Sequence, residues 1–368
     1  MSIKTYKNKI LLILSIPLVL LAICIGTSLG SSNISILDTF SILANKFFSV
    51  PLLDGIEPKQ VSIIWNLRLP RVLLAFMVGG SLAASGAIVQ SVLKNQLASP
   101  YTLGLSSGAS LGVGIIIVTG ASIPFLGRLT MPIVGFLCSL ITMIIVLKFA
   151  EKVDRGLSNT TIILVGMVLS LFFSATLTTI SALASDKMES ITMWSMGSFS
   201  MRGWSYVKAG IPFFIIGILG VSFYFKEMDV LTFGEEAAKT IGVDTNKVKR
   251  RLFLFVAILT GSAVALSGTI GFIDLIAPHV VRKIFGSKHA YVIPMSVVFG
   301  GCMMIMTDLV SRTIVAPSEL PVGAITALIG GPFFAYIYFK KSNCKRYKQN
   351  KKNIGLYNFS TLSYVCSK

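Results

Sequence analysis

Charged residues are scarce in this sequence, where they make up 13% of 368 residues. An ordinary soluble domain carries about twice that share. The charges that do occur form short clusters between long apolar runs, and the mean hydropathy is +0.79. This pattern is typical of a chain whose main solvent is lipid. It predicts a polytopic membrane protein and excludes a soluble core domain.

Residue patterns that carry catalysis or bind metal are also missing. There are only two histidines, and the five cysteines show no C-x-x-C spacing, so no zinc site or disulfide framework is indicated. No G-x-S-x-G or H-E-x-x-H pattern occurs. The stretch Gly234–Thr240 (GEEAAKT) resembles a phosphate loop, but Ala238 stands where a glycine must precede the lysine. We expect no catalytic residues, no metal and no cofactor, so that a partner or an ion gradient must supply energy.

Acidic residues are outnumbered 15 to 33 by basic ones, which gives a net charge of +18. The basic residues flank apolar runs, where they set membrane orientation, and this argues against nucleic-acid binding. Seven of them lie in Lys340–Lys352. We interpret residues 1–340 as a single transmembrane permease domain and 341–368 as a basic cytoplasmic tail that contacts anionic lipid.

The apolar runs predict an all-α fold with ten transmembrane helices. Nine runs lie near residues 10–29, 69–92, 100–119, 129–149, 160–184, 207–225, 249–268, 290–310 and 321–339. A tenth piece, 270–285, is broken by Pro278, and hydropathy alone does not decide whether it crosses. Because basic clusters favour the cytoplasmic side, an even number of spans must separate Arg251 from Lys340. The broken piece must therefore cross, with both termini in the cytoplasm of the cell membrane.

Polar residues inside these spans are few. Asp274, Asp308 and His279 are the ionisable ones, and Asp308 can pair with Arg312 one helical turn away. A carrier driven by an ion gradient usually needs more intramembrane carboxylates, although this alternative stays open. The hydroxyls of Ser174 and Thr178 lie on a lipid-depth helix and are candidates for a translocation pathway, with Asp274 as a further one.

Five blocks in order resemble the permease subunits of type II ABC importers for ferric siderophores, haem and vitamin B12. They span roughly residues 60–340 and include RLPR at Arg68–Arg71, WSMGSFSMRGW at Trp194–Trp204, LTFGEEAAKTIGV at Leu231–Val243, SGTIGFIDLIAPHVVR at Ser267–Arg282 and PSELPVGAITALIGGP at Pro317–Pro332. The resemblance implies ten helices per subunit and a second permease subunit, identical or paralogous, around a central pathway. It also implies two cytoplasmic ATPase subunits and an extracellular or periplasmic solute-binding protein as partners.

The resemblance also implies residue roles. Arg68, Arg71 and Arg312 match outer-surface arginines that pair with carboxylates of the binding protein. The loop Gly234–Gly242 matches the element that docks on the ATPase, with Glu235 and Glu236 facing basic residues, Ala237 and Ala238 packing, and Gly242 forming the turn between two short helices.

Two positions depart from the family pattern: Asp274 replaces a usual glycine and Gln96 a usual proline. Asp274 could bind substrate, face water or pair with Arg282 or Lys283. On family prevalence the expected cargo is a ferric siderophore, then haem, then cobalamin.

Overall fold

The computed structural model describes residues 3–30, 34–154 and 156–336, and within these ranges it contains helices and loops but no strand. The chain divides into two compact units, Met1–Thr326 and Ala327–Lys368. The second is described only in residues 327–336, which are helical, so the predicted basic tail 341–368 lies outside the described residues. The all-α prediction is confirmed.

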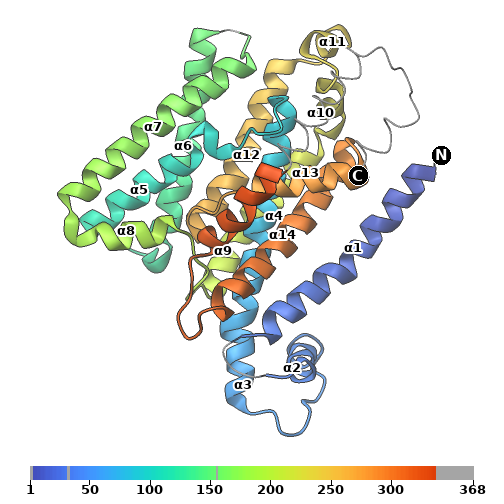
Figure 1. Ribbon diagram of the computed structural model, residues 1–368, viewed down its shortest axis with the longest axis vertical. Helices are drawn as coiled ribbons and strands as arrows, with labels where there is room; N and C mark the ends of the chain where they lie inside the picture. Colours follow the sequence, from blue (N-terminus) through green and yellow to red (C-terminus); the bar gives the residue numbers. More distant parts are fainter. Residues whose placement is uncertain (1–2, 31–33, 155, 337–368) are drawn as a thin grey trace, which may run out of the picture. The chain divides into compact units, whose positions relative to one another are not determined.

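The described residues of the first unit form the fourteen helices α1–α14, joined by short turns and single-turn helices, and the start of a further helix at Val322 (Figure 1). In chain order they are α1 (Ile3–Ser28), α2 (Ile36–Phe48), α3 (Pro58–Ser62), α4 (Leu69–Val92), α5 (Leu105–Thr119), α6 (Thr130–Val153), α7 (Asn159–Leu183), α8 (Met188–Ser195), α9 (Trp204–Ser222), α10 (Phe225–Leu231), α11 (Glu235–Thr240), α12 (Thr245–Ser267), α13 (Ile273–Phe285) and α14 (His289–Thr313). The π-helical turn η1 (Ile63–Arg68) joins α3 to α4, and the 3-10 turn η2 (Pro100–Leu103) precedes α5.

Seven of the described helices are long and apolar enough to cross a bilayer. They contain α1, α4, α6, α7, α9, α12 and α14, and each coincides with a predicted span. Two further apolar helices, α5 and Val322–Tyr336, are shorter. The broken piece near 270–285 is the helix α13, which begins at Ile273. The chain is therefore an integral membrane protein, while the count of ten crossings stays a prediction.

Helix α4 is the centre of the first unit, since 89% of its most apolar window is buried. It packs on α12, α13 and α14. Glycine, which has no Cβ, permits these helices to pack closely. A Cβ on Gly79 would lie 2.3 Å from the carbonyl oxygen of Gly300, and one on Gly86 would lie 1.9 Å from that of Asp274. Small residues at such crossings let helix backbones pack closely in lipid.

Helices α5, α6 and α7 form a second packed group. A Cβ on Gly108 would meet the hydroxyl of Thr142 at 2.0 Å, and one on Gly112 would meet the Cys138 sulfur at 2.4 Å. Gly104, Gly108 and Gly112 are four residues apart, and these contacts explain the last two. The first, Gly104, has a φ of +82° and ends η2 before α5 begins, so it forms a turn rather than a helix face.

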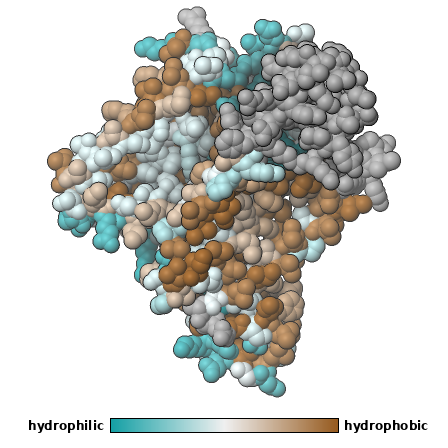
Figure 2. All heavy atoms as spheres, in the orientation of Figure 1, coloured by the Kyte–Doolittle hydropathy of each residue, from teal (hydrophilic) through white to brown (hydrophobic). Residues whose placement is uncertain are grey.

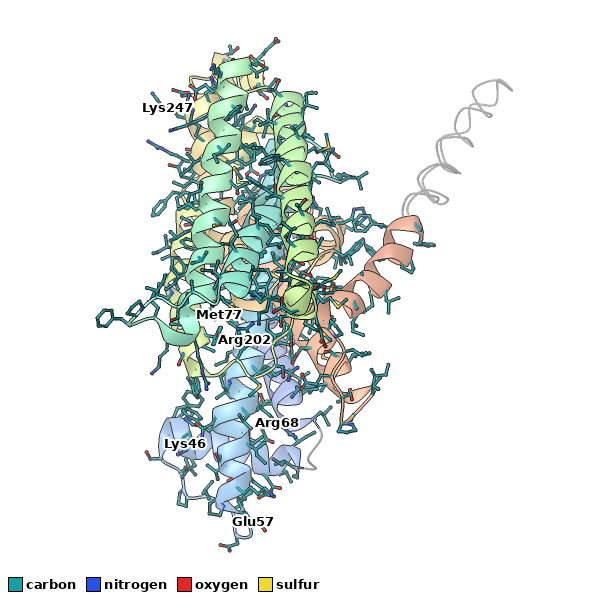
Figure 3. The ribbon with its side chains drawn as sticks, turned by 90° about the vertical axis from the view of Figure 1, so that its left-hand side faces the viewer. Lys46, Glu57, Arg68, Met77, Arg202 and Lys247 are labelled. Carbon is teal, nitrogen blue, oxygen red and sulfur yellow. The ribbon has the colours of Figure 1, made fainter. Side chains whose placement is uncertain are left out.

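Short helices and polar residues gather at the two ends of the helix bundle. Figure 1 shows α10 and α11 at one end and α2 and α3 at the other, and Figure 3 places Lys247 and Glu57 at these opposite ends. Hydrophilic residues concentrate there in Figure 2, with hydrophobic residues along the flank between them. This distribution fits a bundle whose middle contacts lipid.

Candidate functional site

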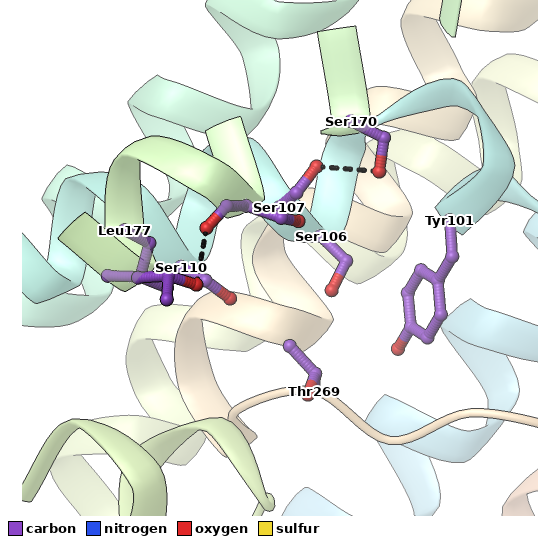
Figure 4. A pocket seen from close by; sticks show the side chains of 9 residues that line it. Tyr101, Ser106, Ser107, Ser110, Ser170, Leu177 and Thr269 are labelled. Carbon is purple, nitrogen blue, oxygen red and sulfur yellow. Dashed lines mark hydrogen bonds between the residues drawn. The ribbon is translucent and has the colours of Figure 1, made fainter. Parts of the chain in front are cut away.

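A cavity lined by hydroxyl groups lies where η2, α5 and α7 meet the turn before α13 (Figure 4), and its volume is about 340 Å³. Its lining consists of Tyr101, Ser106, Ser107, Ser110, Ser170, Ser174, Leu177, Thr178 and Thr269. Eight of these nine described residues carry a hydroxyl and none is charged. Such a wall offers hydrogen bonds to a polar ligand without the strong attraction of a fixed charge.

Helical spacing aligns the hydroxyls on α7. Ser170, Ser174 and Thr178 are separated by four residues each, so they form one stripe along a helix face. Ser107 on α5 donates to the Ser170 hydroxyl at 3.1 Å, which joins the two helices at the cavity wall. The hydroxyl of Thr178 donates to the carbonyl of Ser174 at 2.9 Å and can still accept a hydrogen bond.

Of the lining residues, Ser174 and Thr178 were predicted from the sequence as pathway candidates and the others were not. The hydroxyl of Tyr101 donates to the carbonyl of Ile270 at 2.7 Å, which fixes η2 against the turn that contains Thr269. Ser106 and Ser110 lie one helical turn apart on α5, and this spacing could have predicted a polar face on that helix. The contribution of η2 could not be read from spacing, because it depends on a contact across 169 residues.

Asp274 does not line the cavity. Its side chain is buried at the start of α13, and the hydroxyl of Ser99 donates to its Oδ2. A carboxylate in the first turn of a helix is stabilised by the free amides and the helix dipole. Arg282, a partner considered from the sequence, instead donates to the side chain of Gln90 and to the carbonyl of Ala87. The pathway role of Asp274 stays a prediction.

The three arginines with predicted docking roles meet near the end of the bundle that carries α2 and α3. Their residues are only 6–9% exposed. Arg71 donates to Asp308 at 2.8–3.1 Å and to Glu319 at 2.8 Å. The Nε of Arg312 lies 3.6 Å from the Asp308 carboxylate.

Backbone carbonyls take part in the same arginine cluster. Arg312 donates to the carbonyl of Gly26, and Arg68 donates to those of Thr27 and Ser28 at the end of α1. Partial burial acts to raise the pKa of Glu319, but its hydrogen bond and charge contact with Arg71 outweigh this and lower the pKa. The arginines thus tie α1, α4 and α14 together, and their contact with a binding protein stays a prediction.

The predicted coupling loop Gly234–Gly242 contains the short helix α11 and its turns. Together with the preceding helix α10 it forms Phe225–Gly242, which we call the coupling segment. The turn between α10 and α11 is formed by Gly234, with φ +133°. The turn expected at Gly242 lies between α11 and α12, and α12 is a long helix rather than a short one. Gly242, with φ +90°, follows α11. Both conformations favour glycine because it has no Cβ.

Glu235 of this segment already has a partner within the chain. The ammonium group of Lys249, a fully buried residue on α12, lies 2.6 Å from its Oε1. Lys249 also donates to the carbonyl of Leu157 at 2.9 Å and to Asn159 at 3.0 Å. A buried lysine needs such a complete set of acceptors. It connects α11 to the loop before α7 and leaves Glu236 as the exposed acid.

A second buried contact holds α10. The Nδ1 of His289 lies 2.6 Å from Asp229, and its Nε2 lies 2.6 Å from the hydroxyl of Ser91. The backbone amide of His289 also donates to Asp229 at 2.9 Å. This order of Ser, His and Asp resembles a hydrolytic triad, but Ser91 is buried in the last turn of α4. The contact joins α4, α10 and α14 at the end opposite to the arginine cluster.

The FecCD transport family matches residues 18–340. The chain belongs to this family. It is 41% identical over 320 residues to the ABC transporter permease protein YvrB of Bacillus subtilis (strain 168), covering 87% of this chain and 90% of the relative. It is 38% identical to the hemin transport system permease protein HmuU of Yersinia pestis, with 76% and 84% covered.

A solved structure described as an inward-facing conformation of a metal-chelate type ABC transporter has a similar fold. Its TM-score is 0.78 at 28% identity, and the match covers 90% of this chain and 99% of that one. The FecCD chain described here is therefore an ABC transporter permease of the membrane, as the five sequence blocks indicated.

Proposed function

We propose that this FecCD permease is the membrane-spanning part of an ATP-driven importer and that the hydroxyl-lined cavity belongs to its pathway. The observation that carries this proposal is the uncharged polar wall between α5 and α7, which includes Ser174 and Thr178. A transported ligand must leave its site as readily as it enters, and a wall without fixed charge meets this requirement better than a tight ionic site.

The proposed cargo is an intact metal chelate. The similar solved structure is a metal-chelate type transporter, and HmuU is a hemin permease. A chelate surrounds its metal with organic ligand atoms, so a wall of hydroxyls can contact it without coordinating the metal. A ferric siderophore stays our first expectation, ahead of haem and cobalamin. Asp274, buried beside Ser99, would support the wall from behind rather than contact the cargo.

A second permease subunit is proposed to cover the cavity. Ser174 and Thr178 are exposed on α7, a helix that is long and apolar enough to span a membrane. Hydroxyls at this depth are more stable facing water or protein than lipid. An identical or paralogous subunit that presents the same face would close a pathway between the two chains.

The other partners follow from the two ends of the bundle. Two ATPase subunits are proposed to contact the coupling segment through exposed residues such as Phe233, Glu236 and Ile241, with Ala237 and Gly242 beside them and the buried Ala238 supporting α11. An external binding protein is proposed to dock near Arg68, Arg71 and Arg312. In this orientation ten crossings, counting α5, α13 and Val322–Tyr336, leave both termini in the cytoplasm.

Bulky substitutions in the cavity test the proposal. We expect Ser174→Trp and Thr178→Trp to reduce uptake of a radiolabelled iron chelate to background in proteoliposomes that contain the ATPase and the binding protein. Thr119→Trp is the control, because Thr119 is exposed on α5 outside the cavity lining. Uptake in Ser174→Trp and Thr178→Trp as high as in an active Thr119→Trp variant would exclude this cavity from the pathway.

A further inference from the structure

Helix α2 carries a continuous face of large apolar side chains that is mostly exposed in the described part of the chain. The exposed members are Ile36 (59%), Leu37 (72%), Phe40 (65%), Phe47 (62%) and Phe48 (80%). At 100° per residue these positions share about one third of the helix circumference. A contiguous apolar surface of this kind indicates a partner that is itself apolar.

The remaining faces of α2 have partners that fix its rotation. Ile42 is fully buried and packs with Ile34 and Ile64. The hydroxyl of Ser41 accepts from the amide of Leu53 at 3.1 Å, and the Asn45 side chain donates to the carbonyl of Val50 at 2.9 Å. The apolar face therefore cannot turn inward without loss of these contacts.

The direction and length of α2 exclude a further membrane crossing. In Figure 1 it is viewed nearly along its own axis, whereas α4 runs down the page, so α2 lies across the direction of the spans. Its 13 residues would extend only about 20 Å, while the hydrocarbon core is about 30 Å thick. A short apolar helix with this orientation is typical of a segment that lies in the membrane interface.

Aromatic side chains mark the same level of the bundle. The ring of Phe47 lies 5.6 Å from that of Trp65, which lies 5.2 Å from that of Trp204. The indole of Trp204 donates to the carbonyl of Trp65 at 2.8 Å. Tryptophan is enriched where apolar spans meet the headgroups. The exposed Lys46 at the end of α2 can reach a lipid phosphate from this level.

We propose that the apolar face of α2 inserts into the membrane leaflet at its end of the bundle, so that phospholipid is its partner. Helix α2 packs on α1, which itself exposes apolar side chains such as Ile13, Leu14 and Leu20 along a candidate span. Helix α7, where the second subunit is proposed, lies on the flank of the bundle opposite to α1 (Figure 1). Lipid is thus the apolar medium next to α2.

Lipid quenching of a fluorescent label tests this proposal. The five native cysteines are replaced by alanine, NBD is attached at Phe40→Cys or Leu37→Cys, and the protein is reconstituted in phosphatidylcholine vesicles. Lys59→Cys on the exposed side of α3 is the control. We expect blue-shifted emission and strong quenching by a 5-doxyl lipid at positions 37 and 40, with quenching by aqueous iodide only at position 59.

Two results would overturn the proposal. One is iodide quenching without doxyl quenching at both α2 positions, which would place the face in water. The other is protection from both quenchers that disappears when the protein is diluted to one copy per vesicle, which would assign the face to a second copy. Use of two labelled positions on the same face keeps the test valid if one variant does not fold.

Discussion

The carboxylate of Asp308 lies against the guanidinium of Arg71, accepting from its Nε at 3.0 Å and its Nη2 at 2.8 Å. Asp308 is fully buried, and Arg71 also binds Glu319. Three arginines and two carboxylates leave this cluster with one net positive charge. Its first role is therefore to join α1, α4 and α14, and a binding protein would meet a surface that these contacts hold in place.

Removal of one member of this buried pair should destabilise the protein strongly. We expect Asp308→Ala to reduce the free energy of unfolding by about 3–5 kcal/mol, because Arg312 would lose its carboxylate and Arg71 would keep only Glu319 as a counter-charge. Thermal unfolding in detergent measures the change. The matched control is Asp186→Ala, since Asp186 pairs with Lys187 on the surface, and there we expect a change of less than about 1 kcal/mol. Equal shifts in the two variants would contradict the structural role.

Lys249 should control how firmly α11 is held. We expect Lys249→Met to destabilise the protein by about 3–5 kcal/mol, because Glu235 would lose its buried cation. The double variant Lys249→Met/Glu235→Leu should recover part of this loss, since no charge then remains unpaired. A double-mutant cycle of unfolding midpoints measures the coupling. Additive effects would show that the two side chains do not interact.

His289 should hold α10 in position. We expect His289→Ala to increase amide hydrogen exchange in residues 225–231. The variant removes the contact between the imidazole and Asp229 that holds α10 against α14. Exchange in the middle of α12 serves as the internal control. The variant Ser91→Ala should have a smaller effect, since the His289–Asp229 contact remains. Unchanged exchange in α10 after His289→Ala would exclude this contact as a support.

The close crossing of α4 and α13 at Gly86 should not tolerate an added Cβ. A Cβ on Gly86 would lie 1.9 Å from the carbonyl oxygen of Asp274, so Gly86→Ala must separate α4 from α13. We expect a loss of about 1–3 kcal/mol, the range for overpacked sites. Gly203→Ala is the control, because nothing lies within 4 Å of its added carbon. A stable Gly86→Ala protein would show that this close contact is not required.

The positions of the long spans could be predicted from sequence because lipid imposes a simple requirement. A run of about 20 apolar residues satisfies its backbone as a helix, and α4 has the predicted bounds 69–92. Helix α2 was not predicted because its 13 residues are too few to span the membrane. Polar residues that contact the following loop, such as Ser41 and Asn45, also interrupt its apolar sequence.

Long-range pairs were beyond the sequence analysis for a different reason. Glu235 was assigned to a partner protein, and its contact with Lys249 depends on how α12 returns beside the loop at Leu157. Likewise, the sequence indicated the glycine turn at Gly242 but not the additional turn at Gly234 that separates α10 from α11. Local spacing predicts a helix face or a turn, whereas the pairing of charges requires the packed bundle.

The energy source of uptake tests the central claim most directly. Proteoliposomes would contain the permease, its binding protein and either the native ATPase or a variant that binds ATP without hydrolysing it. We predict that uptake of the iron chelate requires the native ATPase and internal ATP and is unchanged by an uncoupler. Uptake that persists with the inactive ATPase and collapses with the uncoupler would contradict the account and indicate an ion-gradient carrier.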